Sequence, residues 1–241
     1  MIIMIKIAVG IGENKDILKA CDIFLKDNTN TEIKLITSDD ELVDAILDED
    51  IDAVVRGSLP ASGVIKKLKK EFPDISRATY INGDDKELLL APVGIDEGIT
   101  TDDKLNIAIN CAEFLKKQDK TPKISILASG RKGDYGRSEE ISKSIDESES
   151  LTELIKNKTN FEVTNHYILI EKAIENKSNV IIAPNGIIGN IIFRSLVLVN
   201  SWPSYGAITF GIKGVYIDTS RAQNVKGYTR SLNLAYKLAN I

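Results

Sequence analysis

The chain has 241 residues, of which 43% are hydrophobic and 27% charged, a balance typical of a globular protein with one large domain or two small ones. The net charge of −4 argues against a nucleic-acid-binding protein, which usually carries a basic surplus, and no apolar run approaches the roughly 18 residues of a membrane span. We therefore expect a cytoplasmic protein with no nucleic-acid or membrane partner, in which Cys21 and Cys111 are buried, reduced thiols.

The hydrophobic pattern predicts strands and helices in alternation along the chain. The predicted strands cover residues 6–10, 32–37, 51–57, 87–94, 123–129, 179–185, 205–211 and 214–220. The predicted helices lie near residues 17–25, 39–47, 64–72, 101–115 and 138–157, from about 188 onward, and from the last strand to the C-terminus. Two capping pairs, Ser38 with Glu41 and Thr100 with Asp103, mark helix starts.

The predicted strands are continuous runs rich in β-branched residues, which is typical of parallel strands covered by helices on both faces. The segment 73–86, which begins with a proline, is the best candidate for a crossing between domains. Four lysines between positions 66 and 70 form either a phosphate-binding run or the solvated outer face of a helix. The apolar positions around them favour the solvated face.

Four loops that follow predicted strands carry glycines, hydroxyl side chains and arginines: 56–62, 127–137, 183–190 and 218–221. In open α/β sheets the ligand site lies beyond the carboxyl ends of the strands. Glycine lets an anion approach the backbone, a helix N-terminus attracts it, and arginine offers a fork that matches phosphate. The loops therefore predict an anionic, phosphorylated ligand; the alternative is turn glycines with solvent-facing cations.

Other motifs are incomplete or absent. The stretch "GRKGDYG" lacks the end of a Walker A motif, and "VGIGEN" has only two of the three glycines of a dinucleotide fingerprint. His166 is the only histidine, so we expect no histidine-based metal site and no metal ligand set, and we place His166 at the surface or at a helix start.

Three stretches resemble the phosphate acetyl- and butyryltransferases: "LLLAPVGIDEGITTDDKLNIAINCAEFL", "ISILASGRKGDYG" and "VIIAPNGIIGNIIFRSLVLVNSWPSYGAITFGIKGVYIDTSR". The third repeats that family's order of an apolar strand, a Gly-Asn helix start, a basic residue and a strand ending in Ser-Arg. The resemblance covers roughly residues 52–225. The stretches "GSLPAS" and "SGRKGDYGRSEE" are similar to one branch, the methanogen marker protein 4 or MtxX family, which is described as methyltransferase-related.

The resemblance implies the two-domain α/β fold of isocitrate and isopropylmalate dehydrogenases and of phosphate acetyltransferases, with a cleft between the domains. It implies a second domain, 76–211, inserted into a first domain of 1–75 plus 212–241, and a homodimer paired through the second domain. The implied catalytic residues are Ser220 and Arg221. Asp218, just before them, is a further catalytic candidate as a proton acceptor, although the resemblance itself does not imply that role. The implied ligand- and phosphate-binding residues are Gly57, Ser58, Ser129, Lys132, Gly133, Gly189, Asn190 and Arg194, and the cationic loop 127–137 adds Arg131 as a candidate.

One departure from the transferases concerns the base. They use an aspartate shortly after the Ser-Arg pair to take the proton from the coenzyme A thiol, whereas Asp218 is the last acid in this chain. We therefore expect a phosphate acyltransferase-like protein that binds a phosphorylated or coenzyme-A-like ligand and is linked to methyl transfer in methanogenesis, with methyltransferase-complex subunits as partners. The alternatives are an active phosphate acyltransferase and a non-catalytic accessory subunit. No cofactor is evident; coenzyme A and phosphate are candidate substrates.

Overall fold

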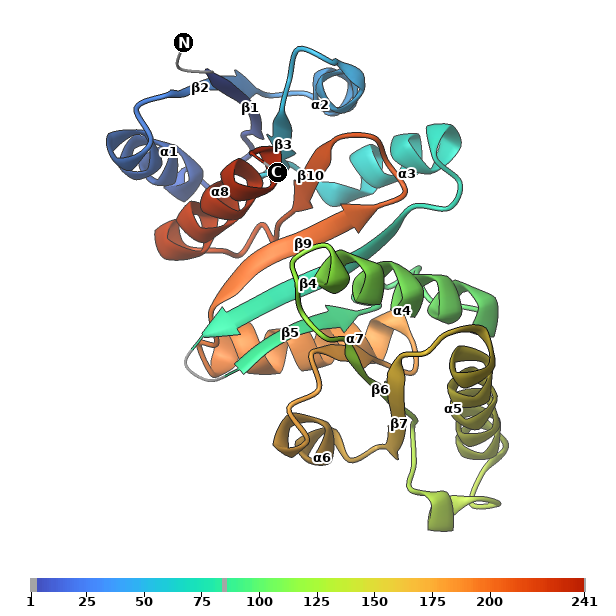
Figure 1. Cartoon of the computed structure of the whole chain (residues 1–241). Coiled ribbons are helices and arrows are strands. Elements are labelled where there is room, and N and C mark those ends of the chain that lie inside the picture. The colour runs from blue at the N-terminus through green and yellow to red at the C-terminus, as the bar shows by residue number, and fades with distance from the viewer. Residues whose placement is uncertain (1–3, 84–85, 241) are drawn as a thin grey trace. The chain divides into compact units, whose positions relative to one another are not determined.

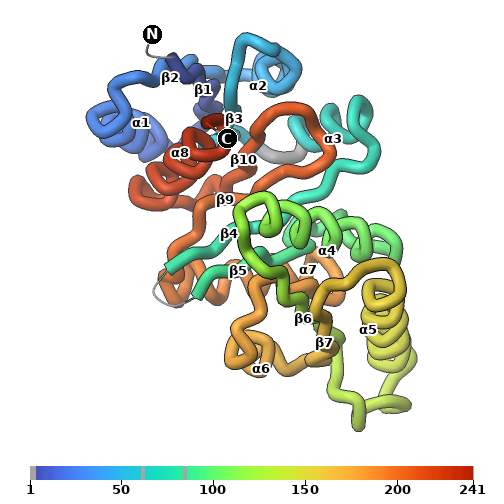
Figure 2. Tube along the Cα trace, in the orientation of Figure 1, coloured from blue at the N-terminus to red at the C-terminus, as the bar shows by residue number. Residues whose placement is uncertain are grey.

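The computed structural model describes residues 4–83 and 86–240 (Figures 1 and 2). The chain divides into two compact units, the first made of Met1–Ile75 with Pro203–Ile241 and the second of Ser76–Trp202. Strands and helices alternate in both units, as the hydrophobic pattern predicts. Across the described residues, no helix combines the length and the apolar character needed to traverse a bilayer.

The first unit contains a mixed sheet with the strand order β2-β1-β3-β10-β9. These strands are β1 (Ile5–Gly10), β2 (Thr31–Ile36), β3 (Ala53–Val55), β9 (Ser204–Phe210) and β10 (Val215–Asp218). The first four strands of this order run parallel, and β9 pairs with β10 in the antiparallel direction. The expectation of parallel strands is therefore wrong for β9, which a short turn joins to β10.

Helices cover both faces of this sheet. They are α1 (Asp16–Asp27), α2 (Asp39–Leu47), α3 (Ala61–Glu71) and α8 (Val225–Ala239). Helices α1 and α8 pack together on one face, and α2 and α3 on the other (Figure 1). Ser38 caps α2 by accepting a hydrogen bond from the Glu41 amide, as predicted. The apolar face of α3 is buried while Lys66 and Lys70 are exposed, which confirms the solvated-face interpretation.

The second unit has the strand order β4-β5-β8-β6-β7. Its strands are β4 (Ser76–Gly83), β5 (Lys86–Ala91), β6 (Lys123–Leu127), β7 (Glu162–Tyr167) and β8 (Val180–Ile182). Strands β5, β8, β6 and β7 run parallel, and β4 pairs with β5 in the antiparallel direction. Its helical segments are α4 (Thr101–Lys116), η1 (Lys132–Asp134), α5 (Glu139–Lys158), α6 (Ile170–Glu175), α7 (Gly186–Phe193) and the π-helical η2 (Arg194–Val199).

The sheet of the second unit is also covered on both faces. Helices α4 and α5 contact each other on one face, and α6, α7 and η2 build a core cluster with the other face (Figure 1). Thr100 and Asp103 form a complete capping box at the start of α4, as predicted. The cysteine prediction also holds, because Cys21 and Cys111 are free and buried, and burial raises the pKa of the Cys21 thiol to about 12.

Four elements have no counterpart among the predicted ones: β4, η1, β7 and α6. Strand β4 lies within the predicted crossing 73–86, whose residues 84 and 85 lie outside the described residues. Its polar residues Ser76, Arg77 and Thr79 are buried, so its sequence does not show the apolar run of a core strand. The two-unit division also assigns residues 203–211 to the first unit, because β9 pairs with β10; the domain limits themselves stay a prediction.

Candidate functional site

The first unit brings three strand ends together. Strands β1, β3 and β10 are parallel neighbours, so the loops after them, 10–14, 56–60 and 219–223, meet at one edge of the sheet. The loops after β1 and β3 interlock: a Cβ added at Gly10 would lie 2.3 Å from the Arg56 carbonyl oxygen, and one at Gly12 2.3 Å from that of Ser58. The two glycines of "VGIGEN" therefore allow close approach between loops, and no dinucleotide is needed to explain them.

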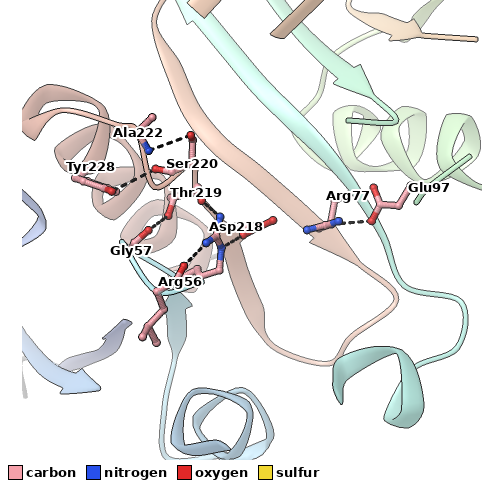
Figure 3. Close-up of polar contacts among 10 residues, drawn as sticks. Arg56, Gly57, Arg77, Glu97, Asp218, Thr219, Ser220, Ala222 and Tyr228 are labelled. Atoms are coloured by element: carbon pink, nitrogen blue, oxygen red, sulfur yellow. Dashed lines mark hydrogen bonds and ion pairs between the residues drawn. The ribbon is translucent and has the colours of Figure 1, made fainter. Parts of the chain in front are cut away.

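Arg56 lies at the centre of these loops, and its side chain is only 6% exposed. Its guanidinium donates to the Asp218 carboxylate and to the carbonyl oxygens of Leu59 and Thr219 (Figure 3). Among the strand-end arginines, this one is committed to the protein interior. The same contacts hold the Asp218 carboxylate against a buried cation. Asp218 is thus an ion-pair partner of the loops, which disfavours its proposed role as a proton acceptor.

Gly57 and Ser58 shape the loop after β3. Gly57 has a φ of +61°, and a Cβ there would meet the Gly10 carbonyl oxygen at 2.0 Å, so a side chain is excluded. Its own carbonyl accepts a hydrogen bond of 2.6 Å from Thr219 Oγ1 (Figure 3). Ser58 is buried, and its hydroxyl accepts a 2.8 Å hydrogen bond from the Gly12 amide. Both residues have structural contacts that account for them, and a role in ligand binding stays a prediction.

The Ser220–Arg221 turn is fixed through its backbone. Tyr228 on α8 donates its hydroxyl to the carbonyl oxygens of Ser220 and Arg221, both at 3.3 Å. The Ser220 hydroxyl accepts a 3.2 Å bond from the Ala222 amide (Figure 3). The side chain of Arg221 is exposed, and no described residue forms an ion pair or hydrogen bond with its guanidinium. The turn therefore presents one available guanidinium on a fixed backbone.

Asn14, in the loop after β1, is a contact of this turn that the sequence did not reveal. Its amide donates to the carbonyl oxygens of Arg221 at 3.0 Å and Gln223 at 2.9 Å. Tyr228 is fully buried beneath the same turn, and burial raises the pKa of its hydroxyl to about 12. The only sequence signal for this contact is an asparagine just after a glycine-rich strand end. That signal does not indicate that Arg221 and Gln223 are its partners.

In the second unit, the loop after β6 is organised around Asp134 and α5. The Asp134 carboxylate accepts the Arg131 amide at 2.8 Å and Arg137 Nη1 at 2.7 Å, and these bonds lower the pKa of Asp134 below its usual 3.8. Ser129 lies half-buried against Ser144 of α5, with its amide 2.9 Å from that hydroxyl. This loop projects beyond the start of α5 (Figure 1).

The remaining groups of this loop are open to solvent. Arg131 and Lys132 are exposed, and Lys132 Nζ makes only a long ion-pair contact of 3.7 Å with Glu149. A Cβ added at Gly133 would meet nothing within 4 Å, so nearby packing does not explain that glycine.

Helix α7 begins at Gly186, capped by Asn185, whose side chain accepts the Ile188 amide at 2.9 Å. The expected start near 188 is therefore corrected, because the side-chain cap lies three residues earlier. Gly189 and Asn190 fall in the second turn and pack α7 onto the segment after β5. A Cβ at Gly189 would lie 1.8 Å from the Pro92 carbonyl oxygen, and Asn190 Nδ2 donates to the Val93 carbonyl at 2.9 Å.

Arg194 follows α7 and is exposed, and none of the described residues forms an ion pair or hydrogen bond with its side chain. Two further polar contacts of the second unit, those of Arg77 and Lys104, were not predicted from the sequence. Arg77 Nε lies 2.7 Å from Glu97 Oε1 in a buried ion pair (Figure 3), and the buried Lys104 ammonium donates to Glu147 at 2.8 Å and to the Pro184 carbonyl at 3.1 Å. Lys104 therefore holds the turn that leads into α7.

Among residues 4–83 and 86–240, no cluster of three or more His, Cys, Asp or Glu side chains could hold a metal ion. His166 lies half-buried in strand β7, with Nδ1 2.9 Å from Ser125 Oγ, so its expected place at a helix start is wrong. Ser125 is fully buried, which keeps this Ser–His contact away from any substrate.

Relatives of the chain come from methanogens. A protein of Methanocaldococcus jannaschii named as an uncharacterized methyltransferase is 38% identical over 242 residues, which is 96% of each chain. A protein of Methanosarcina mazei named "Putative methyltransferase mtx subunit X" is 36% identical over 89% of this chain and 78% of its own. No protein-family model matches the chain.

Solved structures share the fold at low identity. A branched-chain phosphotransacylase from Enterococcus faecalis has a TM-score of 0.76 with 17% identity, covering 98% of this chain and 99% of its own. The 4-hydroxythreonine-4-phosphate dehydrogenase of Klebsiella pneumoniae has a TM-score of 0.62 with 11% identity, covering 97% and 99%. The predicted isocitrate dehydrogenase-like and phosphate acetyltransferase-like α/β fold is thus confirmed. The methanogen relatives, by contrast, are 38% and 36% identical over 96% and 89% of this chain. The chain therefore belongs to the methyltransferase-related MtxX family of methanogens.

Proposed function

We propose that this protein binds an anionic, phosphate-bearing ligand at the Ser220–Arg221 turn and serves a methyl-transfer reaction, as the names of its relatives suggest. The observation that carries the proposal is the Arg221 guanidinium, which is exposed and has no described partner on a backbone fixed by Asn14 and Tyr228. A guanidinium whose neighbours do not neutralise it, at the carboxyl end of a parallel strand, suits phosphate or another oxyanion.

Helix α8 supports the same ligand class. Asn224 caps this helix, accepting the Gly227 amide at 2.9 Å, and the chain from Arg221 leads directly into it. A helix N-terminus adds a partial positive charge next to the arginine. In the second unit we propose the exposed cations Arg131, Lys132 and Arg194 as further phosphate contacts, with Ser129 and Gly133 beside the first two.

The structure of the turn disfavours transacetylation. Asp218 is engaged by Arg56, and the Tyr228 hydroxyl, with its pKa raised to about 12, is a poor proton acceptor at neutral pH. The transferases carry their aspartate shortly after the Ser-Arg pair, and in this chain Gly227 lies in that region, six residues after Arg221. A Cβ at Gly227 would lie 2.0 Å from Gln223 Oε1, so an acid cannot replace this glycine without displacing Gln223. Methyl transfer depends more on an aligned donor and acceptor than on such a base.

The missing base also favours a second candidate function, a non-catalytic subunit of a methyl-transfer complex. This candidate would keep the anion site and lack turnover. An active phosphate acyltransferase is the third candidate function, and it requires a base other than Asp218 and Tyr228.

The test is a thermal-shift and calorimetric titration with inorganic phosphate, acetyl phosphate and coenzyme A, with corrinoid and pterin compounds in parallel. A ligand at 100 times its dissociation constant should add about 2.7 kcal/mol of stability. Arg221→Ala should weaken binding of phosphate compounds by about 1.5–3 kcal/mol, while Lys237→Ala, which removes an exposed cation from the last turn of α8, should leave it unchanged.

Two outcomes would contradict the proposal: no phosphate compound binds, or Arg221→Ala binds as the unaltered chain does. A coenzyme-A-dependent assay with acetyl phosphate distinguishes an active phosphate acyltransferase from the other two candidate functions. We expect a rate lower than that of a competent transferase by roughly 10²–10⁴, the usual contribution of a general base. Rapid turnover would instead select the acyltransferase.

A further inference from the structure

Asn14 joins two loops that lie far apart in the sequence. It follows β1, and both of its side-chain donors are used on carbonyl oxygens of the turn after β10: Nδ2 lies 3.0 Å from the Arg221 oxygen and 2.9 Å from the Gln223 oxygen. Its Oδ1 accepts the Asp16 amide at 3.0 Å, which fixes the amide group against the start of α1. Both donors of the amide and one acceptor site of its oxygen are thus used by the protein.

These bonds act on the residue that would bind the anion. The carbonyl oxygen of Arg221 accepts hydrogen bonds from both Asn14 on the β1 loop and Tyr228 on α8, while the Arg221 side chain remains exposed. The direction in which a side chain leaves the backbone depends on where the backbone is fixed, so these contacts limit the positions that the guanidinium can reach.

We infer that Asn14 is the positioning residue of the Ser220–Arg221 anion site. It orients the turn, and it does not itself contact the ligand. This inference rests on the proposed function for the identity of the ligand, but the clamp between Asn14 and the turn can be tested without any ligand.

Two substitutions of Asn14 remove its hydrogen-bond donors while keeping the side chain close to its original size. Asn14→Asp keeps the acceptor for the Asp16 amide and replaces the donors by an oxygen that repels the two carbonyls. Asn14→Leu is similar in size, removes the donors and adds no charge, so a loss of anion affinity in this variant cannot come from charge repulsion. Asn233→Leu is the control, because Asn233 also donates to a carbonyl, that of Thr229, but is exposed on α8.

The first measurement is limited trypsin digestion of the full chain, with cleavage after Arg221 compared with cleavage after the exposed Lys213 in the same sample. We expect both Asn14 variants to increase the ratio of Arg221 to Lys213 cleavage about tenfold, and Asn233→Leu to leave it unchanged. An unchanged ratio in both Asn14 variants would overturn the inference, whatever the protein binds.

The second measurement is the affinity for inorganic phosphate in a double-mutant cycle. We expect Asn14→Leu to weaken phosphate binding about tenfold when Arg221 is present and to have no effect in the Arg221→Ala background, because a positioning residue acts only through the group it positions. Equal losses in both backgrounds would overturn the positioning role. If the unaltered chain binds no phosphate while the cleavage ratio rises as expected, the proposed function is wrong, but the role of Asn14 in fixing the Ser220–Arg221 turn is supported.

Discussion

Arg56 illustrates how a residue type suited to ligand binding can be used inside the protein. Its guanidinium and the Asp218 carboxylate are 6% and 11% exposed, and the arginine also binds two carbonyl oxygens of neighbouring loops. Most of its hydrogen-bond donors are thus directed at the protein itself. The partner of Arg56 lies 162 positions away, so the sequence alone could not distinguish this arginine from Arg221.

Breaking this pair should destabilise the first unit strongly. We expect Arg56→Ala or Asp218→Asn to lower the free energy of unfolding by about 3–5 kcal/mol, because each leaves a buried charge without its partner. Urea denaturation would measure the change. Lys67→Ala, which removes the solvent-exposed pair with Asp40, should cost less than about 1 kcal/mol. Equal effects of the buried and exposed pairs would contradict this prediction.

His166 gives the protein a defined pH dependence. Burial, and then the nearby Lys123 charge, lower its pKa below the usual 6.5. The unfolded chain therefore binds a proton at this site at a pH where the folded chain does not. We expect the stability contributed by His166 to be complete above pH 6.5 and to be lost as the pH falls from 6.5 through the lower folded pKa. His166 is the only histidine, so the free energy of unfolding, measured with urea between about pH 5 and 7.5, should depend less on pH in His166→Gln. An unchanged pH dependence in this variant would contradict the assignment.

At the scale of elements, the sequence identified those with a clear apolar period and the two capping pairs, which agree with the helix starts observed. It missed β7, an edge strand with the largely polar sequence "EVTNHY", because an edge position does not require an apolar run. It placed the start of α7 too late, at about 188, because the Asn185 cap was not recognised. It also gave no structural reason for Gly189, because the contact that requires this glycine is with Pro92, nearly a hundred positions earlier. Short-range patterns could not reveal that contact.

The packing of α7 on the segment after β5 leads to a prediction. In an ordinary helix, Gly→Ala stabilises by about 1 kcal/mol. At Gly189 we expect the opposite, a loss of about 1–3 kcal/mol in the free energy of unfolding, because the new Cβ would lie 1.8 Å from a backbone oxygen. Gly133→Ala, where a Cβ meets nothing within 4 Å, is the control and should change stability by less than about 0.5 kcal/mol. Stabilisation by Gly189→Ala would show that the helix can move away.

At the scale of the whole molecule, we propose that the second unit forms a homodimer, as the resemblance to phosphate acyltransferases implies. The outer face of α7 carries Ile187 and Ile191, which are 57% and 60% exposed and one helical turn apart. Exposed aliphatic side chains in sequence positions i and i+4 form one apolar strip, which is a common feature of subunit contacts.

We expect the unaltered chain to sediment as a dimer at micromolar concentration and the double variant Ile187→Asp, Ile191→Asp to sediment as a monomer. Leu47→Asp is the matched control, since Leu47 is 47% exposed on α2 of the first unit. A monomeric unaltered chain would exclude the dimer. A dimer that survives in the double variant would place the contact elsewhere.

The first unit is built from both ends of the chain, and this has a consequence for its synthesis on the ribosome. Strand β3 pairs with β10, and α8 packs on α1, yet β3 ends at Val55 and β10 begins only at Val215, while α1 ends at Asp27 and α8 begins only at Val225. The nascent chain must therefore carry β1, β2 and β3 with one sheet edge open until β10 has emerged, whereas the second unit is continuous and can fold as soon as Trp202 has left the exit tunnel. The segment made first is thus the last to reach its native state, and during that interval β3 presents an unpaired sheet edge to which a strand of another chain can add.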